Sequence, residues 1–188
     1  MQIESFLEDA AQGTPQKTAL VCGQRRLTYA QLERLCNRLA HGLIGAGVER
    51  GDRVAVHLDN SVEAVISIFA VLKAGAAVMM VNPATKPPKL AYLLNHARAH
   101  TVILSARKAM ALQAAGLELP VLRTVIYTPT AKLTPSIPGK HCVAFDYLLE
   151  QEAAHDRPPV KRAVDLDLAA LLFTSGSSGR PKGVQGLH

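Results

Sequence analysis

Residues 53–81 read RVAVHLDNSVEAVISIFAVLKAGAAVMMV, and this stretch decides the fold. The nearly continuous apolar run at residues 53–58 is typical of a strand that is buried on both faces, as the strands of parallel sheets are. Asn60 can cap a helix that runs to Ala74. Residues 76–81 then form the next strand. The order strand, helix, strand predicts a βαβ unit with its two strands side by side and parallel.

The same alternation continues on both sides of this unit. Residues 19–22 and 25–27 predict a hairpin. Thr28 and Gln31 have capping-box spacing at the start of an amphipathic helix that stops at Gly45. We expect further helices at 87–97, 105–115 and 145–153 and further strands at 101–104, 121–127 and 168–173. The fold class is therefore α/β, a mostly parallel sheet with helices on its faces.

Composition narrows the function classes. The 188 residues carry 21 Lys and Arg against 15 Asp and Glu, a formal charge of +6, and 48% are apolar, which indicates a globular chain rather than a disordered one. The basic residues are scattered and there is no Trp, so we expect no nucleic-acid partner. Cys22, Cys36 and Cys142 have no C-x-x-C spacing and no signal peptide precedes them, which favours reduced thiols and a cytoplasmic location.

One segment has nearly the composition of a membrane span. Residues 64–81 are almost all apolar, and their length is near the minimum for a spanning helix. Lys73 lies in the middle, and inserting its charge into a membrane would cost about 3 kcal/mol. Gly75 follows at a position where a helix of a globular domain would end. We therefore expect a buried helix, a turn and a buried strand, with no membrane span. Two Pro-rich stretches, residues 128–141 and 155–159, are interpreted as loops within one domain.

The chemistry is concentrated after the last predicted strand, where residues 174–183 read TSGSSGRPKG. Its glycines allow a tight turn whose backbone amides form a concave anion site, and Lys182 adds a positive charge. A polyphosphate is the ligand that fits. The pattern is no Walker A loop, because Arg180 and Pro181 separate Gly179 from the lysine. A Gly/Ser surface loop without a ligand is the alternative, and the position after a buried strand disfavours it.

Residues 173–184 resemble the phosphate-binding signature of the adenylate-forming, or AMP-binding, superfamily. That superfamily contains acyl-CoA synthetases, amino-acid adenylation domains of peptide synthetases and firefly luciferase. Four upstream segments resemble its N-terminal portion in order and spacing: residues 17–21, 27–32, 47–56 and 72–76. Residues 81–83, VNP, are most like an acyl-CoA synthetase. Two departures stand out: Ser178 replaces the more usual Thr, and residues 185–188, QGLH, replace apolar residues followed by Ser or Thr and His.

The resemblance implies a reaction and a set of ligands. A small carboxylic acid reacts with ATP, accompanied by Mg²⁺, to give an acyl adenylate and pyrophosphate, and the acyl group then passes to coenzyme A. The resemblance assigns no catalytic residue and no metal ligand within this sequence. By resemblance, the residues that bind the ATP phosphates are Thr174, Ser175, Gly176, Ser177, Ser178, Gly179 and Lys182.

The resemblance also implies that residues 1–188 are a partial N-terminal AMP-binding domain. In the family, the adenine contacts, the acidic residue associated with Mg²⁺, most of the acyl pocket and the catalytic lysine of the mobile small C-terminal domain all follow the glycine-rich loop. We therefore expect a fragment of an AMP-forming acid:thiol ligase that does not turn over by itself. Such a fragment exposes apolar sheet surface, so we expect marginal stability and self-association.

Three alternatives remain open. The first is an amino-acid adenylation domain fragment that loads a carrier protein. The second is a non-catalytic phosphate-binding or regulatory module, and the third is a distinct phosphate-binding NTPase. His96 and His100 have the helical spacing of a metal pair, but no third ligand is evident, so we interpret them as surface histidines. The remaining carboxylates that could suggest acid–base chemistry are interpreted as solvated or helix-start charges: Glu8, Asp9, Asp146, Asp165 and Asp167.

Overall fold

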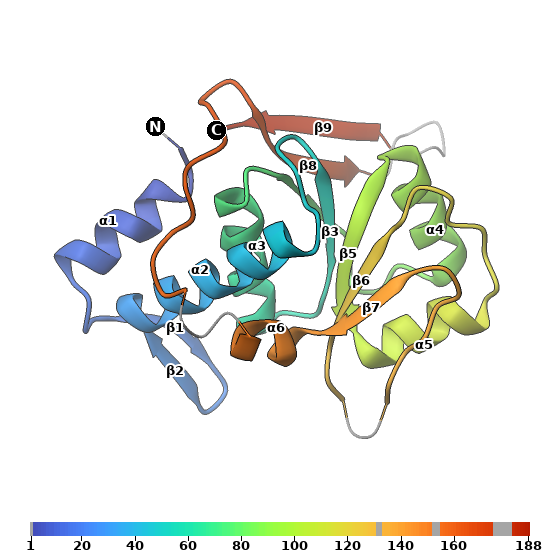
Figure 1. Ribbon diagram of the computed structural model, residues 1–188, viewed down its shortest axis with the longest axis horizontal. Coiled ribbons are helices and arrows are strands. Elements are labelled where there is room, and N and C mark those ends of the chain that lie inside the picture. Colours follow the sequence, from blue (N-terminus) through green and yellow to red (C-terminus); the bar gives the residue numbers. More distant parts are fainter. Residues whose placement is uncertain (1, 131–132, 152–154, 175–181) are drawn as a thin grey trace.

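The computed structural model describes residues 2–130, 133–151, 155–174 and 182–188 (Figure 1). Seven strands form one sheet in the order β7-β6-β5-β3-β4-β8-β9. The first six are parallel to one another, and β9 runs antiparallel to β8. This arrangement confirms the predicted α/β fold class. The strands are β3 Arg53–His57, β4 Ala77–Met80, β5 Ala99–Ser105, β6 Thr124–Thr128, β7 His141–Ala144, β8 Leu168–Thr174 and β9 Lys182–Leu187.

Helices cover both faces of the sheet and enclose two apolar cores. Side chains of α2, α3 and α6 pack with Val54 and Val56 on one face, and those of α4 and α5 pack with Ala55 on the other. Successive strand residues point to opposite faces, so the nearly continuous apolar run at residues 53–58 contributes to both cores. Figure 1 shows α2 and α3 on one side of β3 and α4 and α5 on the other. The helices are α1 Ser5–Gly13, α2 Tyr29–Gly45, α3 Val62–Lys73, α4 Pro87–His96, α5 Ala106–Ala114 and α6 Phe145–Gln151.

Local signals account for the helix starts, with one correction. The Thr28 side chain accepts from the backbone N–H of Gln31, and the Gln31 side chain accepts from that of Thr28, as the capping box predicts. The prediction that Asn60 caps α3 was wrong by one residue. Ser61 is the cap, because its backbone is extended and its Oγ accepts from the N–H of Ala64 at 3.1 Å.

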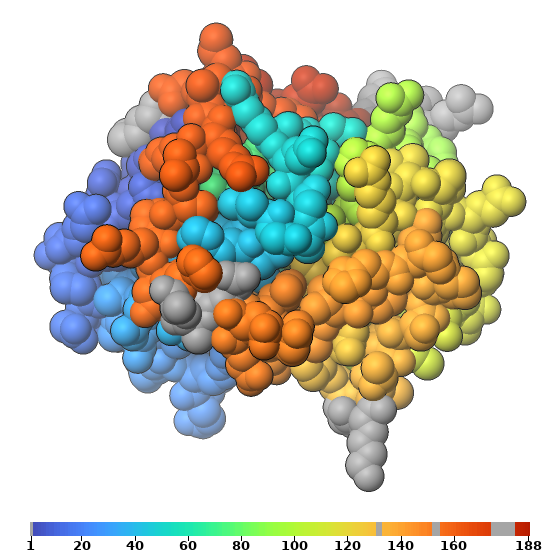
Figure 2. All heavy atoms as spheres, viewed as in Figure 1, coloured from blue at the N-terminus to red at the C-terminus, as the bar shows by residue number. Residues whose placement is uncertain are grey.

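The N-terminal third adds a two-stranded hairpin and a helix beside the main sheet. Strands β1, Thr18–Cys22, and β2, Arg25–Thr28, pair antiparallel as predicted. The chain after α6 returns over the N-terminal region, as Figure 2 shows for residues 155–167. Hydrogen bonds fix this return: Asn37 Nδ2 donates to the carbonyl of Asp156 at 2.8 Å, and Arg38 Nε donates to the Asp156 carboxylate at 2.7 Å.

The predicted membrane-like segment folds as a buried helix, a turn and a buried strand. It contains α3 and β4, which are joined through Gly75 at φ 79°. Lys73 is buried at 4% exposure, with its ammonium between the carboxylates of Glu8 and Glu33. Among the residues that the structure describes, no helix is long and apolar enough to cross a membrane.

Candidate functional site

The glycine-rich sequence connects the last two strands of the sheet. Strand β8 lies next to β4 in the sheet, and β9 pairs with its outer side. In this hairpin Thr174 is the register partner of Lys182, so the backbone brings these two predicted site residues together. Residues 175–181 join them. The other predicted phosphate-binding residues lie outside the described part of the chain: Ser175, Gly176, Ser177, Ser178 and Gly179.

The last glycine of the motif has a packing role instead of a place in the turn. Gly183 lies within β9, opposite Phe173. A Cβ atom on it would lie 3.2 Å from Leu171 Cδ1 and 3.5 Å from Phe173 Cε1. A side chain here would therefore press on the end of the Leu171 side chain, while the ring of Phe173 lies across the neighbouring strand at ordinary contact distance. The sequence interpretation of this glycine as part of a ligand-binding bend was wrong.

Strand β8 ends at the edge of the sheet where ligands bind in open α/β folds. Thr174 ends β8, and all six parallel strands end at the same edge as β8. The chain changes direction between β3 and β5, on the far side of β4 from β8: α3 leads from β3 to β4 over one face, and α4 leads from β4 back past β3 to β5 over the other. A crevice forms outside the carboxyl ends of strands at such a switch point, and ligands bind there. The topology therefore places the ends of the TSGSSGRPKG sequence at a binding edge.

Strand β4 ends at this edge in a turn. Val81 is buried, and the Asn82 side-chain oxygen accepts from the N–H of Ala84 at 2.8 Å. This local hydrogen bond offers the backbone an alternative to the strand ladder, and Pro83 has no N–H to continue that ladder. The VNP sequence thus turns the chain away from the sheet directly beside β8.

Sequence reasoning missed His57, the last residue of β3 at the same edge. Its ring is 2% exposed, and Nε2 lies 3.3 Å from the carbonyl oxygen of Pro83. Burial lowers the pKa of His57, and the nearby ammonium of Lys108 lowers it further, so the ring is neutral at pH 7. A carbonyl only accepts, so Nε2 carries the proton and Nδ1 is a buried acceptor without a partner among the described residues. The only sequence signal for it was a histidine at the end of a buried strand.

The structure separates the two histidines that have metal-pair spacing. His96 ends α4 and stacks on Tyr92, whereas His100 lies in β5 with Nδ1 2.9 Å from Asp52 Oδ1. Within the described ranges, no three His, Cys, Asp or Glu side chains gather where they could hold a metal ion. Asp167 instead forms a two-pronged ion pair with Arg50 at 2.8 and 2.9 Å.

Comparison with known families decides the class of this site. Residues 7–188 match the family model described as AMP-binding enzyme. The chain belongs to this AMP-binding enzyme family. The resemblance noted from the sequence is therefore confirmed, and the hairpin sequence is a segment of an AMP-binding domain.

Curated relatives of this AMP-binding chain include two kinds of enzyme. A medium/long-chain-fatty-acid–CoA/3-oxocholest-4-en-26-oate–CoA ligase of Mycobacterium marinum is 29% identical over 188 residues, which cover 100% of this chain and 34% of the relative. Surfactin synthase subunit 2 of Bacillus subtilis is 32% identical over 188 residues, which cover 100% of this chain and 5% of the relative. The AMP-binding chain thus spans about a third of the ligase and a small part of the synthase.

Solved structures agree with the AMP-binding fold. The anthranilate CoA ligase AuaEII in complex with anthranoyl-AMP matches with a TM-score of 0.89 and 26% identity over 100% of this chain and 35% of that one. The N-terminal domain of FACL13 from Mycobacterium tuberculosis matches with a TM-score of 0.80 and 28% identity, over 100% of this chain and 44% of that one. The architecture is that of the N-terminal subdomain of adenylate-forming enzymes.

Proposed function

We propose that the full-length protein containing these residues is an AMP-forming acid:thiol ligase. It activates a carboxylic acid with ATP and transfers the acyl group to coenzyme A. The observation that carries this proposal is the position of the TSGSSGRPKG sequence on the β8–β9 hairpin, at the binding edge of the sheet of an AMP-binding domain. The CoA ligases among the relatives support the choice of acceptor.

The proposed role of the hairpin is to hold the β- and γ-phosphates of ATP. A substrate carboxylate oxygen attacks the α-phosphorus, the bond from that phosphorus to the bridging oxygen breaks, and pyrophosphate leaves with the electron pair. Backbone amides, hydroxyls and the lysine ammonium stabilise the negative charge that grows on the leaving group. The register pairing of Thr174 with Lys182 supports this role, because it holds both ends of the turn together. The residues proposed for it are Thr174, Ser175, Gly176, Ser177, Ser178, Gly179 and Lys182.

In the second half-reaction the thiol sulfur attacks the acyl carbon, AMP leaves, and the thiol proton passes to solvent. Mg²⁺ is proposed as the companion of ATP, where it would neutralise phosphate charge. The described residues contain no cluster of three metal-binding side chains, so we assign no ligand for it to this chain and no step to it.

A second candidate is the activation of an amino acid for a carrier protein. The observation in its favour is that peptide synthetases match this chain as well as the CoA ligases do. PhsC, the phosphinothricin tripeptide synthetase of Streptomyces viridochromogenes, is 34% identical over 186 residues, which cover 99% of this chain and 15% of that protein. Both candidates share the adenylation step and differ in the acid and the thiol.

Acid-dependent exchange of labelled pyrophosphate into ATP tests the shared step in the full-length protein. Fatty acids, aromatic acids and amino acids are supplied separately, and coenzyme A is then added with detection of acyl-CoA by mass spectrometry. Exchange with a fatty or aromatic acid followed by acyl-CoA supports the ligase. Exchange with an amino acid alone and no acyl-CoA supports the carrier-protein route. ATP binding without any exchange identifies a non-catalytic module, and ATP hydrolysis without acid identifies an NTPase.

We also propose that a polypeptide cut to residues 1–188 does not catalyse this exchange and self-associates. The side chains of Leu172, Val184 and Leu187 on the terminal hairpin are 46%, 52% and 55% exposed, an apolar surface that favours association. Sedimentation and the exchange assay on this polypeptide test both parts. A monomer at micromolar concentration contradicts the first, and exchange contradicts the second.

A further inference from the structure

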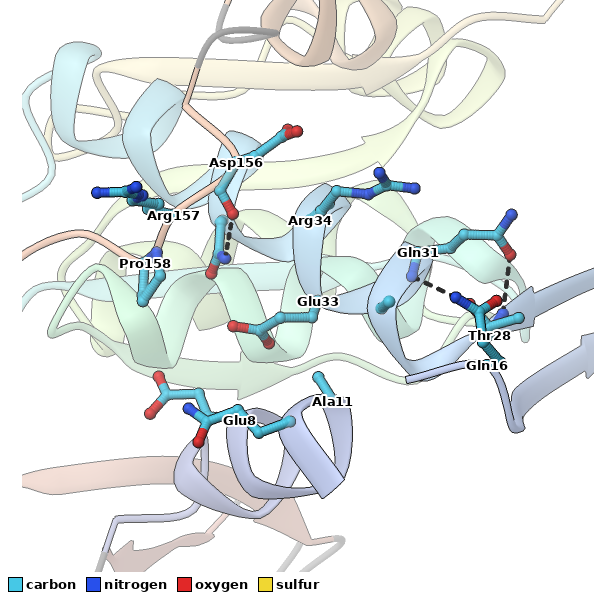
Figure 3. A pocket seen from close by; sticks show the side chains of 13 residues that line it. Glu8, Ala11, Gln16, Thr28, Gln31, Glu33, Arg34, Asp156, Arg157 and Pro158 are labelled. Carbon is cyan, nitrogen blue, oxygen red and sulfur yellow. Dashed lines mark hydrogen bonds between the residues drawn. The ribbon is translucent and has the colours of Figure 1, made fainter. Parts of the chain in front are cut away.

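A cavity of about 430 Å³ lies between α1, α2 and the return segment of residues 155–167. Figure 3 shows Glu33 pointing from α2 toward α1, which carries Glu8. Asn37 lines the cavity as well, and among the described residues none of β8 or β9 does. Both carboxylates are paired with the buried ammonium of Lys73, so the charges of the cavity are balanced within the chain. The cavity therefore calls for no ligand.

The β8–β9 hairpin, in contrast, is packed on one face and open on the other. Leu172 and Val184 are register partners, and their side chains are 46% and 52% exposed. Leu171 and Phe173 point to the opposite face, where they pack against the apolar core beneath α4 and α5. In the described part of the chain β9 is the last strand of the sheet, so no further strand holds the hairpin there. The end of β8 is therefore supported from the side of α4.

Helix α4 meets the end of β8 through aromatic rings. The ring of His96 lies edge-on to that of Phe173, with their centroids 6.2 Å apart and their planes at 65°. Figure 1 shows the arrowhead of β8 beside α4. Tyr92, one helical turn before His96, stacks on the His96 ring at a centroid distance of 5.5 Å with the planes 12° apart. Aromatic side chains prefer these two arrangements, so the three rings form a continuous row from α4 to β8.

The two rings on α4 are not needed to hold this helix on the sheet. Tyr92 is 43% exposed, and His96 is exposed as well. The core face of the helix is formed by four other residues, Leu90, Ala91, Leu93 and Leu94. Removal of the His96 ring leaves that core face intact. The contact that it does remove is the one with Phe173.

We propose that His96 is a positioning residue for the glycine-rich hairpin. Its ring fixes the ring of Phe173, which also lies against β9, because a Cβ on Gly183 would be 3.5 Å from Phe173 Cε1. Phe173 precedes Thr174 in β8, and Gly183 follows Lys182 in β9, so one ring holds both strand ends of the motif. The kinetic consequence rests on the proposed function: a hairpin that is correctly placed only part of the time binds ATP more weakly by that fraction.

Hydrogen exchange of β8 and β9 in the full-length protein, measured by mass spectrometry, tests the contact without any activity. We expect His96→Ala to speed exchange in these two strands about 2- to 10-fold, which is the effect of losing one aromatic pair, and to leave β3 and β5 unchanged. His96→Phe keeps a ring at this position and should restore the exchange of the wild type. The matched control is His41→Ala, because the ring of His41 also contacts another ring, that of His155 at 4.6 Å, but from α2.

Acid-dependent pyrophosphate exchange measures the consequence for ATP. His96→Ala should raise the KM for ATP about 2- to 10-fold and leave the rate constant at saturating ATP unchanged, and His96→Phe should restore the KM. A merely structural role would instead lower the rate constant through loss of folded protein and leave the KM unchanged.

Four results would overturn the proposal. They are unchanged hydrogen exchange of the hairpin in His96→Ala, no restoration by His96→Phe, an equal effect of His41→Ala, and an active His96→Ala enzyme with the KM for ATP of the wild type. If the wild type catalyses no pyrophosphate exchange, the proposed function fails, and hydrogen exchange still decides whether His96 positions the hairpin. The two failures are therefore distinguishable.

Discussion

The ammonium nitrogen of Lys73 lies 2.8 Å from a carboxylate oxygen of Glu8, although 65 residues separate them in the sequence and the lysine side chain is only 1% exposed. Glu33 provides a second carboxylate at 2.9 Å. The contact ties α1 to α3, with α2 between them. It also explains how a lysine is accommodated in the most apolar stretch of the chain, because a buried charge is tolerated when it is paired and hydrogen-bonded.

Replacing Lys73 should destabilise the fold strongly. Lys73→Met leaves two largely buried carboxylates without their shared cation, and removal of one partner of a buried pair costs about 3 to 5 kcal/mol. Lys161→Met is the matched control, because its contact with Glu8 is half exposed and should contribute about 0 to 1 kcal/mol. Urea denaturation of both variants measures the difference. Equal losses of unfolding free energy would show that the burial of Lys73 has no energetic consequence.

Gly75 should not tolerate a side chain. Its φ is 79°, and a Cβ there would lie 2.9 Å from Arg162 Cβ, an atom fixed to the backbone. Gly75→Ala should cost about 1 to 2 kcal/mol for the left-handed backbone and about 1 to 3 kcal/mol more for the clash. Gly116→Ala isolates the backbone cost, since its φ is 57° and nothing lies within 4 Å. In thermal denaturation, Gly75→Ala should therefore have a lower melting temperature than Gly116→Ala. The reverse order would contradict the close approach of Arg162 Cβ to residue 75.

The periodicity of apolar residues, together with the residues that start and end helices, was sufficient to predict most of the fold. The capping box of Thr28, the stop at Gly75 and the alternation of apolar runs all have local physical causes, and each is seen in the structure. Elements that depend on distant partners were missed. Helix α1 is short and is held by Glu8, whose partner is on α3. Strand β7 has four residues after a Pro-rich stretch, and only its pairing with β6 identifies it as a strand.

The candidate site was predictable to a smaller extent. The motif residues could be read from composition and order, and the register of Thr174 with Lys182 shows that the ends of the motif meet. The packing of Gly183 against Phe173 could not be foreseen, because it depends on the β9 pairing, which two glycines in the strand made hard to predict. Nor could the cavity beside Asn37, whose lining comes from residues more than a hundred positions apart.

Acid should weaken the contact between Arg50 and Asp167. The hydrogen bond from Arg50, together with one from the N–H of Val164, lowers the pKa of Asp167 from 3.8 to about 2. Because the folded-state pKa is the lower one, the stabilisation is present above about pH 4 and is lost as the pH falls toward about 2. Asp167→Asn should flatten the dependence of the urea midpoint on pH in this window. Asp9→Asn, an exposed site on α1, is the control, and an equal flattening there would contradict the assignment.

Lys182 should be required for adenylation by the full-length protein. It starts β9, and its backbone pairs with that of Thr174. The proposed function assigns its ammonium charge to the pyrophosphate leaving group. If it stabilises the transition state, Lys182→Ala should lower the rate constant of acid-dependent pyrophosphate exchange about 10²- to 10³-fold, the usual cost of removing one preorganised donor. Lys17→Ala, an exposed lysine beside β1, should leave the rate unchanged. A higher KM for ATP with an unchanged rate constant would instead mean that the lysine binds the ground state and the transition state equally. An unchanged rate would remove Lys182 from the site.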